Sequence, residues 1–219
     1  HGYLVTVIGM RLSCSNTTSG AITPDVAFRL TAILLMLGFL TLVSSTAFAD
    51  DREQRDAREY FFTQTFGDLP EELQVARDGN KLGMLLFFEA ESCQYCQHMV
   101  RKVFSDRGVQ DWFGERFVSI AVDIHGDVEM TDFDGITLPS KVIADHRRVI
   151  LTPLITFIDL EGNEVYRHLG MIRTPEELLV LGEYIAGNHH YLMEYRTYAE
   201  KHGMRKEDGA LMTPAGESE

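Results

Sequence analysis

The sequence predicts an α/β domain in which helices flank a central mixed sheet. This prediction is based on the order of the apolar runs along the chain. The runs at 84–88 and 117–122 lack the alternation of half-exposed strands, as expected for strands buried on both faces. A helical stretch separates them, so we expect the two strands to be parallel, because parallel neighbours require a crossover connection. A third run at 154–158, a turn at 161–163 and a return through 165–166 predict an antiparallel hairpin.

End signals define the first and last helices of this domain. Residues 70–80 are expected to be helical, with Asp68 as the N-cap and Gly79 near the end. The run Thr-Pro-Glu-Glu at 174–177 has the spacing of a capping box with proline in the first turn, which predicts a helix start. A last helix is expected at about 191–202.

Two shorter helices are expected in the middle of the chain. Ser105 is the expected cap of a helix that carries the apolar residues of 109–113. The other covers 139–145 and follows an acidic loop at 123–136. The carboxylates of that loop do not have the spacing of an EF-hand, so we expect a solvated loop instead of a calcium site; they are Asp123, Asp127, Asp132 and Asp134.

The pair Cys93 and Cys96 follows the first strand at the start of a helix. From Cys96 onward the apolar residues at 96, 99, 100 and 103 fall on one helical face, and polar residues occupy the other. Ser92 stands at the expected N-cap, so Cys93 falls in the first turn and Cys96 on the buried face.

The N-terminal region predicts export. An uncharged apolar run at 30–43 follows Arg29 and precedes Ala47-Phe48-Ala49, which predicts a signal peptide cleaved after Ala49. An uncleaved anchor is the alternative, because 30–49 is about as long as a membrane span of roughly 20 residues. Either form exports the rest of the chain, so a periplasmic or otherwise exported protein is expected. The sequence starts with His1, and Met10 is a possible translation start.

Four segments follow from these features. They are the signal peptide at 1–49, a lead-in at 50–67, the folded domain at 68–203 and a disordered tail at 204–219. The lead-in is charged first and aromatic later, and we expect its aromatic side chains to dock on the domain; these are Tyr60, Phe61, Phe62 and Phe66. The chain has a net charge of −13 without a dense basic cluster, so a nucleic-acid surface is excluded, and a monomer is expected.

The chain has three cysteines, and removal of the signal peptide leaves Cys93 and Cys96. A zinc site needs about four ligands, whereas the nearest further candidate, His98, falls on the solvated helical face. A permanent structural disulfide is the second alternative, although a loop this short restrains the unfolded chain little. A redox-active pair therefore explains the motif best. We assign no chemistry to His125, His189 or His190.

The order of elements around the pair resembles the thioredoxin fold over about 69–187. Four stretches also resemble the SoxW-type periplasmic thioredoxins: "LLFFEAESCQYCQHM", "VDIHGDVEMTDFDG", "TPLITFIDLEGNEV" and "YIAGNHHY". The resemblance implies a cis Pro153 facing the active site and Thr152 as a substrate contact. It also implies no cofactor beyond the disulfide, partners among exported disulfide-containing proteins, and a membrane protein as electron donor.

The two cysteines are expected to have unequal roles. A helix N-terminus favours a thiolate, so Cys93 is the expected nucleophile, and the buried Cys96 is the expected resolving thiol. Tyr95 is a candidate contact for the partner. Where thioredoxins carry a buried Asp six residues before the first cysteine, this chain has Phe87; Glu89 is the candidate base for Cys96, with a solvated or capping carboxylate as the alternative.

The expected function is therefore that of an exported thiol-disulfide oxidoreductase that reduces disulfides of partner proteins. A disulfide oxidase or isomerase is the alternative within enzymes, because Gln94 and Tyr95 between the cysteines do not fix the reduction potential. A redox-inactive binding domain of the same fold is a further alternative, but it has no need for both cysteines at a helix start.

Overall fold

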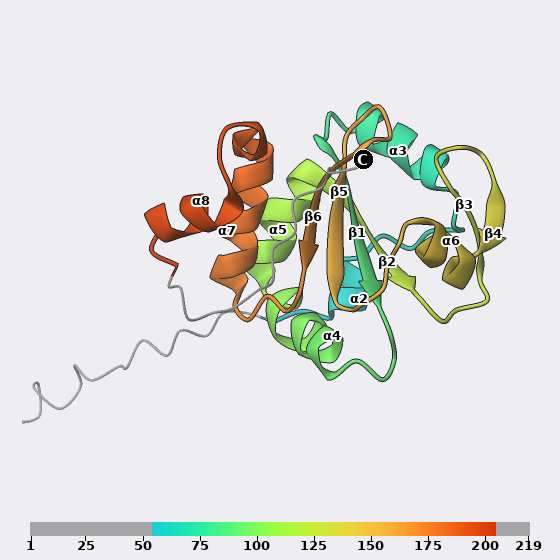
Figure 1. Cartoon of the computed structure of the whole chain (residues 1–219), viewed down its shortest axis with the longest axis horizontal. Coiled ribbons are helices and arrows are strands. Elements are labelled where there is room, and N and C mark those ends of the chain that lie inside the picture. The colour runs from blue at the N-terminus through green and yellow to red at the C-terminus, as the bar shows by residue number, and fades with distance from the viewer. Residues whose placement is uncertain (1–53, 205–219) are drawn as a thin grey trace, which may run out of the picture. The chain divides into compact units, whose positions relative to one another are not determined.

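The computed structural model describes residues 54–204, and a four-stranded mixed sheet forms its centre (Figure 1). The strand order is β2–β1–β5–β6; the strands are β1 (Gly83–Glu89), β2 (Phe117–Asp123), β5 (Leu154–Ile158) and β6 (Glu164–Leu169). β1 runs parallel to β2 and antiparallel to β5, which pairs antiparallel with β6. The predicted mixed sheet, with its crossover and its hairpin, is confirmed. The predicted signal peptide lies outside the described residues, as does nearly all of the predicted tail.

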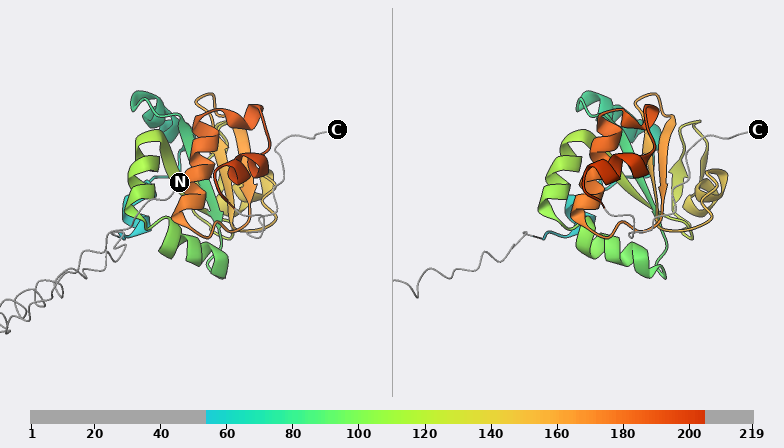
Figure 2. Two further views of the ribbon diagram at one scale, coloured as in Figure 1. Left: turned by 90° about the vertical axis from the view of Figure 1, so that its left-hand side faces the viewer. Right: turned by 60° about the vertical axis from the view of Figure 1, so that its left-hand side comes forward.

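Helices cover both faces of the sheet, as the turned views in Figure 2 show. One face carries α2 (Ala57–Tyr60), α4 (Gln94–His98) with its π-helical continuation η1 (Met99–Val103), α5 (Arg107–Arg116), α7 (Pro175–Ala186) and α8 (Tyr195–Lys201). The other face carries α3 (Leu69–Asp78), α6 (Ser140–His146) and a hairpin of β3 (Glu129–Thr131) with β4 (Thr137–Pro139). None of the helices within 54–204 is long and apolar enough to cross a membrane.

The central strand β1 separates two hydrophobic clusters. Leu85 and Phe87 point into the cluster that contains Cys96, whereas Met84, Leu86 and Phe88 point into the cluster beneath α3 and α6. All five side chains are fully buried. Burial on both faces explains why this strand shows no alternation in the sequence.

Two expected helix caps are confirmed and two are wrong. The Asp68 carboxylate accepts a hydrogen bond from the Glu71 N–H at 2.9 Å, and Thr174 caps α7. Asp106 caps α5 in place of Ser105, whose hydroxyl donates to the Arg101 carbonyl at 2.7 Å and so bonds to the preceding helical turn. The cap of α4 is Cys93 and not Ser92.

The acidic segment at 123–136 is not the loop expected. It contains β3, which pairs with β4 and buries Met130 against the sheet. Two of its carboxylates form ion pairs, Asp127 with Lys141 and Asp132 with Arg147. Among the described residues, no three His, Cys, Asp or Glu side chains are grouped so that they could hold a metal ion.

The lead-in packs into the domain and extends the fold upstream of residue 68. Phe61 stacks on Phe104 with ring centroids 4.5 Å apart, and Phe62 stacks on Phe87 at 5.7 Å. Tyr60 and Phe66 are exposed, so the expectation that all four aromatic side chains dock is wrong for these two. The last helix, α8, begins at Tyr195 instead of 191, after a separate turn η2 (His189–Tyr191).

Candidate active site

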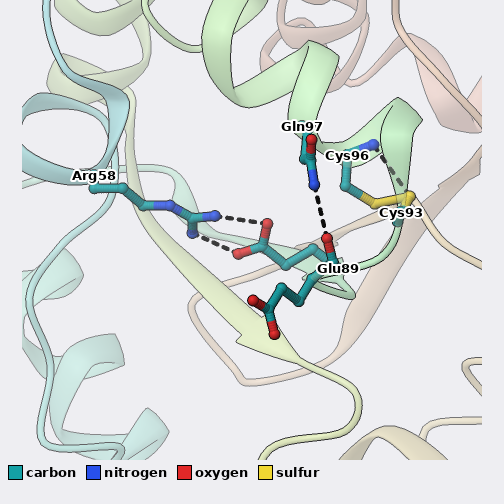
Figure 3. Close-up of a disulfide and its surroundings, with 6 residues drawn as sticks. Arg58, Glu89, Cys93, Cys96 and Gln97 are labelled. Atoms are coloured by element: carbon teal, nitrogen blue, oxygen red, sulfur yellow. Dashed lines mark hydrogen bonds and ion pairs between the residues drawn. A yellow bond between two sulfur atoms is a disulfide. The ribbon is translucent and has the colours of Figure 1, made fainter.

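The two cysteines form a disulfide at the carboxyl end of β1, where α4 begins (Figure 3). Their Cα atoms lie 5.3 Å apart, within the usual range for a disulfide. Cys96 is fully buried in the core cluster, whereas Cys93 is partly exposed. The pair therefore has one sulfur accessible to a partner and one sulfur enclosed by the fold.

The local chain geometry places Cys93 at the helix start. The turn after β1 is closed by the Cys93 N–H, which donates to the Ala90 carbonyl at 3.0 Å. The Gln97 side chain donates to the Glu91 carbonyl at 2.8 Å and ties this turn to α4. The Cys93 Sγ accepts from the Cys96 N–H at 3.1 Å. That N–H has no partner within the helix, so it and the positive end of the helix stabilise a negative charge on this sulfur.

Cys93 opens into a shallow groove of about 510 Å³. The structure brings the predicted contact residues Tyr95 and Thr152 into the lining of this groove together with Cys93. Seven further lining residues were not predicted as contacts: Ala90, Ser92, Gln94, Ile124, His125, Ile150 and Leu151. The signal that could have found two of them is the apolar pair Ile150-Leu151 directly before Thr152-Pro153, outside any predicted strand.

The Thr152–Pro153 peptide bond is cis, and Pro153 is buried at the start of β5. The Pro153 carbonyl accepts from the Gly170 N–H at 3.0 Å and so belongs to the sheet. The backbone N–H and C=O of Thr152 enter no backbone hydrogen bond with any described residue. They are the groups with which an extended substrate chain could pair.

Glu89 ends β1, and its carboxylate points to Arg58 of α2 (Figure 3). The Arg58 guanidinium donates to both carboxylate oxygens, at 2.5 and 2.7 Å. Arg58 also lies over the Phe62 ring, with the guanidinium carbon 5.5 Å from the ring centroid, within the limit of about 6 Å for a cation–π contact. Sequence reasoning missed Arg58, because nothing local links it to Glu89, 31 positions away.

His98 is half-buried instead of solvated. Its Nε2 lies 3.0 Å from the Arg173 carbonyl oxygen, so the ring contacts the loop before α7. This contact joins α4 to the loop between the edge strand β6 and α7.

Comparison with known proteins identifies the family and the fold. A family model described as a thioredoxin-like domain matches residues 69–186. A thioredoxin-fold protein from Helicobacter pylori is 20% identical over 69% of this chain and 97% of its own length, with a TM-score of 0.51, which confirms the fold. A putative disulphide-isomerase from Bacteroides thetaiotaomicron is 25% identical over 57% of this chain and 91% of its own, with a TM-score of 0.44. A Thermus thermophilus thioredoxin is 29% identical over 53% and 82%, with a TM-score of 0.41. The comparison with curated proteins finds no match.

Proposed function

Because the chain belongs to the family of thioredoxin-like domains, we propose that it is a thiol-disulfide oxidoreductase whose Cys93–Cys96 pair reduces disulfides of partner proteins. The observation that carries this proposal is the unequal exposure of the two sulfurs at a helix start. Cys93 faces the groove, and Cys96 is enclosed. A purely structural disulfide does not need this asymmetry.

The reaction consists of two exchange steps. In the reduced protein, the Cys93 thiolate attacks one sulfur of the partner disulfide; that bond breaks, a mixed disulfide forms and the partner's other cysteine leaves as a thiolate. Cys96 then loses its proton and attacks the Cys93 sulfur, which closes the Cys93–Cys96 disulfide and releases the partner reduced. Two electrons pass to the partner, so an external thiol donor must reduce the pair before the next cycle.

Glu89 is the candidate acceptor of the Cys96 proton. It lies on the face of β1 that Leu85 and Phe87 share with Cys96, because alternate residues of a strand point to the same face. Its carboxylate is fixed by Arg58 and makes no hydrogen bond to either cysteine. Proton transfer would therefore pass through a water molecule. The alternative is a structural role in which the ion pair holds α2 against the end of β1.

The cellular setting is also a proposal. The apolar run at 30–43 and the Ala47-Phe48-Ala49 site support export to the periplasm, where the partners would be disulfide-containing proteins. Residues 50–219 contain no cysteine besides Cys93 and Cys96, so a membrane protein that supplies thiols is the donor that we favour. The stretches quoted above support a placement among the SoxW-type periplasmic thioredoxins.

Stoichiometric reduction of a model disulfide tests this function. Protein reduced with dithiothreitol and then freed of it is mixed with 2-hydroxyethyl disulfide, and the released 2-mercaptoethanol is measured. Wild type should release two thiols per chain, and the Cys93→Ser variant should release none. Release by Cys93→Ser at the wild-type level would contradict the assigned roles, and absence of release by wild type would contradict the function.

A further inference from the structure

Three large apolar side chains are exposed around the reactive sulfur. Ile150, Leu151 and Tyr95 have 86%, 61% and 61% of their surface exposed and line the same groove as Cys93. Isolated exposed apolar residues are ordinary, but a contiguous group is typical of a contact surface. Burial of these side chains against an apolar partner would remove apolar surface from water, which favours binding. The groove therefore fits an apolar side chain.

An acidic hollow adjoins this groove. This hollow shares Ser92 and His125 with the groove and is lined further by Glu91 and Asp123. Within 54–204, no ion pair involves either carboxylate; the Asp123 carboxylate only accepts from the His125 N–H at 3.0 Å. Asp127 and Asp132 of the same segment differ, because they form ion pairs with Lys141 and Arg147. The two free negative charges would attract a cation.

From this arrangement we propose that the groove selects polypeptide segments in which the disulfide cysteine stands between an apolar side chain and a lysine or arginine. The cysteine sulfur meets Cys93, and the extended segment pairs with the free backbone groups of Thr152. The apolar side chain lies against Ile150, Leu151 and Tyr95, and the cation lies against Glu91 and Asp123. This inference names the substrate class and rests on the proposed function.

The test compares short peptides as substrates of the pre-reduced protein. Each peptide carries one cysteine in a mixed disulfide with 2-mercaptoethanol. The peptides differ at two positions, two residues before and two residues after this cysteine. These positions hold leucine and lysine, leucine and serine, serine and lysine, or leucine and aspartate. Each is made in both chain directions, and rates are divided by the rate with 2-hydroxyethyl disulfide. The leucine–lysine peptide should react about tenfold faster than the leucine–aspartate peptide at low salt, and added salt should reduce this ratio.

Substitutions separate the contribution of the apolar groove from that of the acidic hollow. The double variant Glu91→Gln/Asp123→Asn should lose the preference for lysine, and Ile150→Ser/Leu151→Ser should lose the preference for leucine. Glu200→Gln and Leu192→Ser remove an exposed carboxylate and an exposed leucine of the C-terminal region and serve as matched controls that keep both preferences.

The outcomes are distinguishable. Equal normalised rates for all peptides, or preferences that survive the groove variants, would overturn this inference while leaving the proposed function intact. Failure of wild type to reduce 2-hydroxyethyl disulfide would overturn the proposed function and this inference with it.

Discussion

His168 on β6 makes the stability of the fold depend on pH. Its ring is fully buried next to Tyr195, with centroids 5.8 Å apart, and neither ring nitrogen has a hydrogen-bond partner among the described residues. Burial in this apolar site lowers the pKa of His168 from 6.5 to about 4. The neighbouring Tyr195 and Tyr166 carry no charge below pH 7, because the ordinary pKa of tyrosine is about 10 and burial raises it further here.

The pKa difference sets both the direction and the size of the effect. Between pH 6.5 and about 4 the unfolded chain binds a proton at His168 that the folded chain does not, so the free energy of unfolding falls as pH falls. The loss levels off below about pH 4 and amounts to about 3 kcal/mol, from 1.36 kcal/mol per pKa unit. His168→Leu should abolish this contribution.

The assay is urea unfolding at pH 4, 5, 6 and 7, with the oxidised pair in every sample. The free energy of unfolding of His168→Leu should rise relative to wild type by about 3 kcal/mol between pH 7 and pH 4. His146→Gln, which changes an exposed histidine, is the control and should parallel wild type. If the free energy of unfolding changed with pH equally for wild type and His168→Leu, the reasoning would be refuted. The His168 ring would then bind protons equally in the folded and the unfolded chain.

Three further predictions concern the pair and its surroundings. Cys96→Ser should accumulate mixed disulfides with partners on a non-reducing gel, and Cys93→Ser should trap almost none; equal trapping by the two variants would reverse the role assignment. Glu89→Gln should slow release of the partner from the mixed disulfide without a matching change in the rate of Cys93 alkylation, and equal slowing of both steps would indicate a structural role only. Phe62→Ala should lower the free energy of unfolding, measured in urea, by about 3 kcal/mol, because the ring is buried against Phe87 and Phe104. The control Phe66→Ala changes an exposed ring and should cost under about 1 kcal/mol. An equally small loss for Phe62→Ala would show that the lead-in does not support the core.

The sheet was predictable because each strand is marked by its own residues. The buried runs of β1, β2 and β5 need no partner to be recognised, and the turn at 161–163 fixes the direction of β6. The hairpin of β3 and β4 was missed because strands of three residues carry too little periodicity, and only Met130 is buried. The ends of the helices depend on competition between neighbouring polar groups, as Ser105 and Asp106 show.

The chemistry of the site was predictable only where it is local. The local sequence around Cys93 and Cys96 predicts that a helix starts at Cys93 and that Cys96 lies on its buried face, and both are observed. The pairing of Arg58 with Glu89 and the approach of Ile150 to Cys93 join segments far apart in the chain. Such contacts depend on the completed fold and leave no pattern in the sequence.

The reduction potential of the Cys93–Cys96 pair tests the central claim most directly. The pair is equilibrated with glutathione or dithiothreitol buffers, and the reduced fraction is measured by alkylation of free thiols. A reductase of protein disulfides should have a potential close to about −270 mV, the value typical of thioredoxin, so that electrons flow from the pair to partners. A potential near about −120 mV, that of a strong oxidant, would contradict the account.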